Sequence, residues 1–333
     1  MSGEINVLGI DETLDYVLKN GSSVARFGDG EIDIISGRSI PYQDYDVELG
    51  VEFWSILENK SDERLVVCMP DVFTGLDRYN KFARDFWKVH LDRYKEIYEN
   101  INWMRWYGST FISRPYIDLE DKSHSERYFE HLKRLWNHRD ILIVEGDTSK
   151  SVVGNDLFDN ANSIARIICP SKNAYFFLEE IETAIRMYGD NKIVLVMLGP
   201  AAKLIAYHLS SENRQIIDIG NIDSEYEWSK MGAKPKVKMP YKHTAEFNYS
   251  DDHLDIEDLN YRSQIVYTVD NFPKISVIIY FDGDTSKLDN VLLSVSEQSY
   301  TNIEIVVIIN DTSYETMKIC EQMSLQDNRL DFT

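Results

Sequence analysis

The chain has 333 residues and a formal net charge of −21, which arises from 56 acidic and 35 basic side chains. This charge repels nucleic-acid phosphates and anionic lipid surfaces, so neither is an expected partner. Hydrophobic residues make up 43% of the chain, enough for packed cores, and the length suggests two domains.

The cysteines and the N-terminus indicate a cellular compartment. Cys68, Cys169 and Cys320 are far apart and define neither a disulfide framework nor a zinc site. No segment has the pattern of a signal peptide or approaches about 18 uninterrupted apolar residues. We therefore expect a cytoplasmic protein without a membrane span.

Residues 1–235 have the pattern of a parallel sheet covered by helices. A helix is predicted around residues 14–18 and ends at Gly21, and SSVARF then forms a short buried strand. Further apolar strands are expected at 65–68, 141–145, 165–169, 193–198 and 215–219, and the clearest amphipathic helices at 173–188 and 201–210. This alternation predicts an α/β, Rossmann-like fold with helices on both faces of the sheet.

Ligands of open parallel sheets bind beyond the carboxyl ends of the strands. The loops that follow Phe27, Glu145, Leu198 and Ile219 should therefore converge on one crevice. Those four loops contain the least ordinary residues of the chain.

The first of these loops begins with the motif RFGDGE, residues 26–31. Asp29 and Glu31 lie one residue apart on a glycine-containing turn, where both carboxylates can face the crevice. Oxygen ligands of this kind suit Mg²⁺ or Mn²⁺, and Gly28 and Gly30 would let a phosphate approach the backbone. An ordinary solvated turn would have the same sequence. The arginines that could hold phosphates or a base are Arg26 and Arg38.

The second and third loops offer anion-binding groups. Lys150, Asn155 and Asp156 follow the strand at 141–145 among small hydroxyl residues, which suit a diphosphate or sugar hydroxyls but also occur in a plain polar loop. Gly199 and Pro200 join a strand directly to a helix, whose free N–H groups form an anion site. A tight turn would look the same. The G-x-G-x-x-G fingerprint is absent from the sequence, which disfavours a nicotinamide-dependent oxidoreductase.

The fourth loop, DIGNIDSEYEW, is acidic. If residues 223–231 are helical, Asp223 and Glu227 share one face, where mutual repulsion would raise one pKa and suit a general base. Glu225 is a further candidate. The alternative is a solvated, acidic helix start.

Two other segments are secondary candidates. The aromatic group WMRWYG at 103–108 could stack on a sugar ring, although core packing is the commoner role of such residues. The segment ISRPYID at 112–118 could project Arg114 into the crevice or form a rigid turn.

In chain order, RFGDGE, GRSIPYQ, ISRPYID, VGNDLFDNA, ICPSKNA, LGP and DIGNIDSEYEW resemble the GT-D glycosyltransferases over about residues 10–235. Members of that family are similar to one another in having a Rossmann-like fold and a D-x-E motif. They transfer hexoses from UDP-sugars onto glycans of bacterial serine-rich-repeat adhesins. The resemblance implies glucose first and galactose next as the donor hexose, and Mn²⁺ or Mg²⁺ as the cofactor. It also implies a glycan acceptor on a glycoprotein, and other glycosyltransferases as partners.

The resemblance also implies residue roles. Asp29 and Glu31 would hold the metal and the diphosphate, and Glu227 is the preferred catalytic carboxylate, with Asp223 and Glu225 as alternatives. The remaining nucleotide-sugar-binding residues would be Arg26, Phe27, Gly28, Gly30, Arg38, Lys150, Asn155, Asp156, Gly199, Pro200 and Asn221.

Two positions depart from the expected family pattern. Asn221 stands where histidine is expected and cannot titrate near neutral pH, and Lys150 replaces an arginine fork by a point charge. Asn221 therefore favours an alternative function, a catalytically inactive module that binds nucleotide sugars or glycans and scaffolds a glycosylation complex.

The rest of the chain is expected to form a linker and a second unit. Residues 236–273 are rich in charge, proline and turn formers. In residues 274–333, KISVIIY, LDNVLLSVSEQ and IEIVVIIND predict a β-α-β unit that resembles the truncated start of a GT-A glycosyltransferase. Asp311 would be its nucleotide-contacting acid, and because no D-x-D motif follows, we expect no activity from this segment alone.

Overall fold

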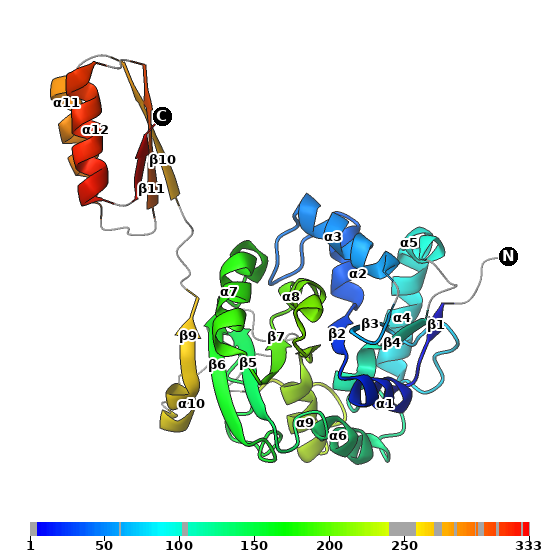
Figure 1. Ribbon diagram of the computed structural model, residues 1–333. Helices are drawn as coiled ribbons and strands as arrows, with labels where there is room; N and C mark the ends of the chain where they lie inside the picture. Colours follow the sequence, from blue (N-terminus) through cyan, green and yellow to red (C-terminus); the bar gives the residue numbers. More distant parts are fainter. Residues whose placement is uncertain are drawn as a thin grey trace. The chain divides into compact units, whose positions relative to one another are not determined.

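The computed structural model describes residues 5–59, 61–101, 106–239, 258–269, 275–282, 285–296, 298, 303–310, 313–327 and 329–332. The chain forms two compact units, Met1–Val269 and Asp270–Thr333 (Figure 1). Within the described ranges, no helix is both long and apolar enough to cross a lipid bilayer.

The first unit is built on a parallel sheet with the strand order β1-β4-β3-β2-β8-β7-β5-β6-β9 among the described residues. The strands are β1 (Asn6–Val7), β2 (Ser23–Arg26), β3 (Leu65–Met69), β4 (Trp106–Ser109), β5 (Asp140–Gly146), β6 (Ser163–Cys169), β7 (Ile193–Met197), β8 (Ile216–Asp218) and β9 (Ile265–Thr268). Strands β2 and β8 pair in the middle of the sheet although they are far apart in sequence. The order of the chain reverses there, which makes the β2/β8 junction the place where a ligand is expected.

Helices cover both faces of this sheet. Helices α3, α7 and α8 lie on one face, and α1, α6 and α9 lie on the other (Figure 1). Neighbouring strand residues alternate between the two cores: Val24 packs on the α1 side and Ala25 on the α8 side. The helices are α1 (Ile10–Asn20), α2 (Asp29–Ile35), α3 (Val47–Glu58), α4 (Lys81–Arg93), α5 (Lys95–Asn100), α6 (Ser125–Lys133), α7 (Leu178–Tyr188), α8 (Ala201–Leu209), α9 (Ile222–Lys230) and α10 (Leu259–Gln264).

The predicted α/β class and the strands predicted from apolar runs are confirmed. Strands β2, β3, β5, β6, β7 and β8 all fall on those runs. The first helix ends at Gly21, as expected, because this residue adopts a left-handed conformation with φ 68° and its N–H bonds the carbonyl of Val17. Strands β1, β4 and β9 were not predicted, since β1 has 2 residues and β4 and β9 have 4 each.

The motif RFGDGE was predicted to form a turn, but the structure places most of it at the start of a helix. Gly28 is the N-cap of α2, so Asp29 and Glu31 stand in the first turn of a helix. Residues two apart on a helix do not face the same side. Glu31 instead folds back and accepts a hydrogen bond from the N–H of Gly28 at 2.8 Å.

The predicted linker over 236–273 is partly wrong, because its residues 258–269 belong to the first unit. Strand β9 pairs in parallel with β6, and α10 lies beside it. Arg166 is buried on β6, forms an ion pair with Glu145, donates to Gln264 at 2.8 Å and lies 4.6 Å from the ring of Tyr261. These contacts explain why a polar segment joins the sheet.

The second unit consists of β10 (Ile275–Phe281), α11 (Thr285–Ser296), β11 (Ile303–Ile309), α12 (Tyr314–Gln326) and β12 (Leu330–Phe332). The strands form a parallel sheet in the order β10-β11-β12, so the predicted β-α-β unit is confirmed. Its resemblance to a GT-A domain stays a prediction, and Asp311 lies outside the described residues.

Packing around β4 leaves no space for a side chain at Gly108. A Cβ atom there would lie 2.7 Å from Sγ of Cys68, 2.7 Å from Val66 and 2.8 Å from Thr13. We expect Gly108→Ala to lower the free energy of unfolding by about 1–3 kcal/mol, measured by urea denaturation, because overpacked cores must shift.

The matched control is Gly50→Ala within α3. Its Cβ would find its nearest neighbour at 3.5 Å, an ordinary contact. Because alanine favours helix over glycine by about 1 kcal/mol, this variant should be as stable as the parent or more so. Equal urea midpoints for the two variants would contradict the packing described for β4.

Candidate active site

A cavity of about 480 Å³ lies at the carboxyl ends of the central strands. The loops after β2, β5, β7 and β8 all contribute to its lining, as the sequence predicted, and those after β4 and β6 join them. Each of these loops contributes at least one lining residue; in the order given, examples are Asp29, Ser151, Gly199, Asn221, Thr110 and Ser171.

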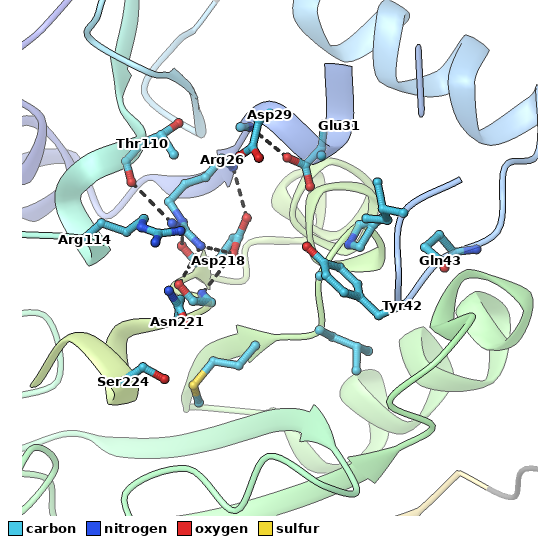
Figure 2. Close-up of a pocket in the computed structure, with 18 of the residues that line it drawn as sticks. Arg26, Asp29, Glu31, Tyr42, Gln43, Thr110, Arg114, Asp218, Asn221 and Ser224 are labelled. Atoms are coloured by element: carbon cyan, nitrogen blue, oxygen red, sulfur yellow. Dashed lines mark hydrogen bonds and ion pairs between the residues drawn. The ribbon is translucent and has the colours of Figure 1, made fainter. Parts of the chain in front are cut away.

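A buried ion pair between β2 and β8 forms the floor of the cavity. Arg26 and Asp218 are 2.9 Å apart, with side chains 7% and 1% exposed. Every side-chain nitrogen of Arg26 donates a hydrogen bond within the protein (Figure 2); the acceptors are Asp218, Thr110, Ser113 and Gly220. Arg26 therefore positions the loops of the site and does not offer a free fork to a phosphate.

Lys203 of α8 extends this network. Its ammonium group lies 2.9 Å from Glu31 and 3.3 Å from Asp218, and it also donates to the carbonyl of Gly199 at 2.9 Å. Burial alone would raise the pKa of Asp218, but Arg26 and Lys203 hold it below its ordinary value. Two buried cations thus balance two buried carboxylates.

Asp29 differs from Glu31 because its side chain is exposed to the cavity. The surrounding protein nevertheless desolvates it, which raises the pKa of its carboxyl, while Arg114 acts in the opposite direction and Glu31 adds to the rise. Asp29 is therefore a carboxylate that a cation bound in the cavity would stabilise.

The residues present fit a divalent metal only in part. Asp29 offers oxygen ligands to the cavity, whereas both oxygens of Glu31 already contact Lys203 or the N–H of Gly28. In the described part of the chain, no group of three or more His, Cys, Asp or Glu side chains could hold a metal. A metal here would need phosphate oxygens and water as further ligands, an arrangement that Mg²⁺ commonly adopts.

Two further cations, Arg114 and Lys236, line the cavity. Arg114 lies 3.6 Å from Asp118, and Lys236 lies 3.9 Å from the same carboxylate. Both cations line the cavity and act on Asp29 electrostatically. Lys236 was assigned to the linker from the sequence, so its place in the cavity was not foreseen.

Two helices point their N-termini at the cavity. The N-cap residues of α8 and α9 are Pro200 and Asn221, and neither helix has a side-chain capping bond among the described residues. Asn221 adopts a left-handed conformation with φ 70°, and its buried Nδ2 has no hydrogen-bond partner in the described structure. Free N–H donors at helix starts attract anions.

The family model for the glycosyltransferase GT-D fold matches residues 24–247 of the chain. The chain belongs to the GT-D family. The sequence resemblance is thereby confirmed for the first unit.

Solved structures of GT-D proteins agree with this assignment. One is described as the highly conserved domain of unknown function 1792, which has a distinct glycosyltransferase fold. It is 55% identical to this chain with a TM-score of 0.78, and the match covers 80% of this chain and 96% of the solved chain. A second is a new glycosyltransferase (DUF1792) from Streptococcus sanguinis. It is 57% identical to this chain with a TM-score of 0.78, and the match covers 80% of this chain and 100% of the solved chain.

Curated relatives of the GT-D domain are longer than this chain. The probable glycosyl transferase Gly of Streptococcus gordonii is 56% identical over 263 residues, which are 79% of this chain and 39% of that protein. Glycosyltransferase GlyD of Streptococcus pneumoniae is 54% identical over 267 residues, which are 80% of this chain and 33% of that protein. The chain spans well under half the length of both.

The acidic residues of α9 differ in whether they reach the cavity. Asp223 lines the cavity, whereas Glu227 does not. One amide nitrogen, Nδ2 of Asn155, donates to Asp223 at 2.6 Å and to Glu227 at 2.8 Å, so the two carboxylates share a face of α9 as predicted. Asn155 thus positions the pair from outside the cavity, and of the two carboxylates Asp223 alone belongs to the lining.

The prediction that Glu225 is catalytic needs correction. Its side chain is fully buried, and Oε2 accepts hydrogen bonds from the N–H groups of Tyr116 and Ile117, both at 3.0 Å. Oε1 has no hydrogen-bond partner among the described residues and lies 3.8 Å from Arg114. Glu225 holds the segment that presents Arg114 to the cavity.

Several other predicted binding residues lie away from the cavity lining. Phe27 is buried in the core, and Arg38 lies over the ring of Tyr94 at 5.8 Å. Asp156 accepts a hydrogen bond from Tyr226 at 2.9 Å, and Lys150 is outside the lining although its neighbours Ser149 and Ser151 belong to it. The lining retains Arg26, Gly28, Asp29, Gly30, Glu31, Gly199, Pro200, Asn221 and Asp223 from the predicted set.

Two lining residues were missed although the sequence contained a signal for them. Lys203 stands one turn into the helix that begins at Pro200, and Tyr42 belongs to the GRSIPYQ motif. Gly199 has φ +52° and approaches the ring of Tyr42 so closely that a Cβ atom would lie 2.9 Å from it.

The buried Glu225 carboxyl should make folding stability depend on pH. Burial raises its pKa from 4.5 to about 7, so between these values the folded state binds a proton that the unfolded state releases. Its stabilising contribution is full below about pH 4.5 and is lost as pH rises through 7.

Relative to Glu225→Gln, we expect the free energy of unfolding of the parent to fall across this window by about 3 kcal/mol, measured by urea denaturation at each pH. Parallel pH profiles for the two proteins would contradict this assignment.

Proposed function

We propose that the first unit is a glycosyltransferase domain that moves a hexose from a UDP-sugar to a glycan acceptor. The observation that carries this proposal is one cavity whose lining combines cations, helix N-termini and carboxylates. Arg114 and Lys236 are the cations given a role here, and Asp29 and Asp223 are the carboxylates given one. Glucose is the first donor hexose to test and galactose the second, as the family resemblance suggests.

The diphosphate would bind along the positive wall. Arg114 and Lys236 supply charge, and the starts of α8 and α9, which have no side-chain cap among the described residues, supply the positive ends of their helix dipoles. The buried Nδ2 of Asn221 lacks a hydrogen-bond partner in the described structure, and a ligand oxygen would provide one. This arrangement suits an anion despite the strongly acidic chain.

The reaction needs stabilisation of the leaving UDP and activation of the acceptor hydroxyl. Asp29 would hold Mn²⁺ or Mg²⁺ together with the diphosphate, and the metal would neutralise charge that develops on the leaving group. Asp223 would accept the proton of the acceptor hydroxyl, held in place by Asn155 at 2.6 Å. Its place in the lining makes it a better base than Glu227.

An inactive binding module is the second candidate, and Asn221 favours it. The amide can donate to a bound ligand but cannot accept a proton at neutral pH. Such a module would bind UDP saturably without turnover.

The experiment that separates these functions is UDP release from a panel of UDP-sugars, with and without Mn²⁺, in the presence of GlcNAc-containing acceptors. We expect metal-dependent release with one preferred hexose. Saturable UDP binding with no release from any donor would favour the inactive module.

Replacement of Asp223 tests the catalytic assignment. We expect Asp223→Asn to lower kcat by about 10²–10⁴-fold, the usual contribution of a general base, while UDP affinity measured by calorimetry stays within about threefold. Glu227→Gln is the matched comparison on the same helix face and should lose less than about tenfold. The assignment would be wrong if Asp223→Asn kept full activity, or if Glu227→Gln were the more damaging change.

A further inference from the structure

Helix α4 carries an unusual row of exposed apolar side chains. Phe82 is 70% exposed, Phe86 41% and Val89 58%. Phe82 and Phe86 are four residues apart, so they lie on the same face of the helix. Exposed large apolar groups that form a continuous patch commonly mark a binding surface.

This row is continuous with the candidate active site. Phe82 and Phe86 line the cavity that contains Asp223, and both also line a second hollow of about 630 Å³ along the outer side of α4. The second hollow continues past Val89 to Arg93. A chain-like ligand can therefore extend from the reacting carboxylate along the helix.

The ring of Phe86 is held by two neighbouring side chains. The ring of Phe86 lies edge-on to Trp87 at 5.3 Å and stacks on His90 at 5.8 Å with an interplanar angle of 20°. Trp87 and His90 are both buried, and His90 is hydrogen-bonded to the hydroxyl of Tyr98 at 2.9 Å. A ring that is already held loses little freedom when a ligand packs on it.

Polar groups of both signs border the apolar row. Lys81 and Asp85 form an exposed ion pair at 2.7 Å, and Lys236 lies 5.9 Å from the centre of the Phe82 ring. A neutral sugar chain needs such a surface, because its hydroxyls require donors and acceptors while the C–H faces of its rings require apolar area.

We propose that Phe82 and Phe86 form the binding platform for the acceptor glycan. The sugar at the reacting end lies near Asp223, and the preceding sugars stack on Phe82 and Phe86 along α4. This inference rests on the proposed function, since it assigns the acceptor side of the same site. A globular protein surface could cover the row but could not follow it into the cavity.

The test measures glycan binding directly, so that it does not depend on turnover. Short hexose and N-acetylhexosamine oligosaccharides are titrated, in the presence of UDP, into the full chain and into the variant Phe82→Ala, Phe86→Ala, with ligand-observed NMR as the readout. We expect binding to the parent to be at least about tenfold tighter than to the variant, because the variant loses the apolar area of two aromatic rings on which sugar C–H faces would pack.

Two further variants distinguish stacking from a change in fold. Phe82→Tyr, Phe86→Tyr should restore glycan affinity, because tyrosine keeps the aromatic faces. Phe176→Ala is the control for loss of an exposed aromatic ring elsewhere, since Phe176 is 59% exposed and lies outside both hollows, and it should bind like the parent. UDP affinity should stay within about twofold in every variant.

The outcomes for the platform and for the transferase function differ. Equal glycan affinity of the parent and the double alanine variant, or no oligosaccharide binding by the parent, would overturn the platform. Loss of glycan affinity in that variant, with UDP affinity retained, would support it even if the parent released no UDP. In that case the proposed transferase function alone would fail.

Discussion

The buried ion pair between Arg26 and Asp218 is the constraint on which the site depends. It joins β2 to β8 where the order of the chain reverses, and Lys203 extends it to Glu31 at the start of α2. Removing one member of such a network leaves an uncompensated buried charge, at a cost of about 3–5 kcal/mol. The same contacts fix where α2 and α8 begin, so the network sets the shape of the cavity as well as its charge.

This network also separates the cations of the cavity floor from those of its wall. Arg26 and Lys203 pair with Asp218 and Glu31, whereas Arg114 and Lys236 lie beside Asp118 in the lining, where the proposed diphosphate would bind. Asp29 and Asp223 lie in the lining, and the aromatic row of α4 borders the same cavity. In the proposed function, the cavity would have a donor side and an acceptor side within a strongly acidic chain.

Much of this arrangement could be predicted from local sequence patterns. Buried strands such as β3 and β7 consist of apolar runs, and the rules of parallel sheets correctly brought the loops after β2, β5, β7 and β8 together. The motifs also named the family. These features depend on residues that are neighbours in the chain or on general rules of topology.

The rest depends on contacts between distant residues. No local pattern shows that Glu225 is buried against Tyr116, or that Lys236 lies beside Asp118. Strand β9 joins the sheet beside β6, where Arg166 donates to Gln264, far away in sequence. Such side-chain environments arise only when the tertiary structure forms.

The most direct test of this account is a crystal structure of the full chain with UDP and Mn²⁺. We expect the diphosphate to lie within hydrogen-bonding distance of Arg114 and of the backbone N–H groups at the starts of α8 and α9, with the metal bound to Asp29. UDP bound at another place, with this cavity left to solvent, would contradict the central claim that the β2/β8 junction builds a nucleotide-sugar site.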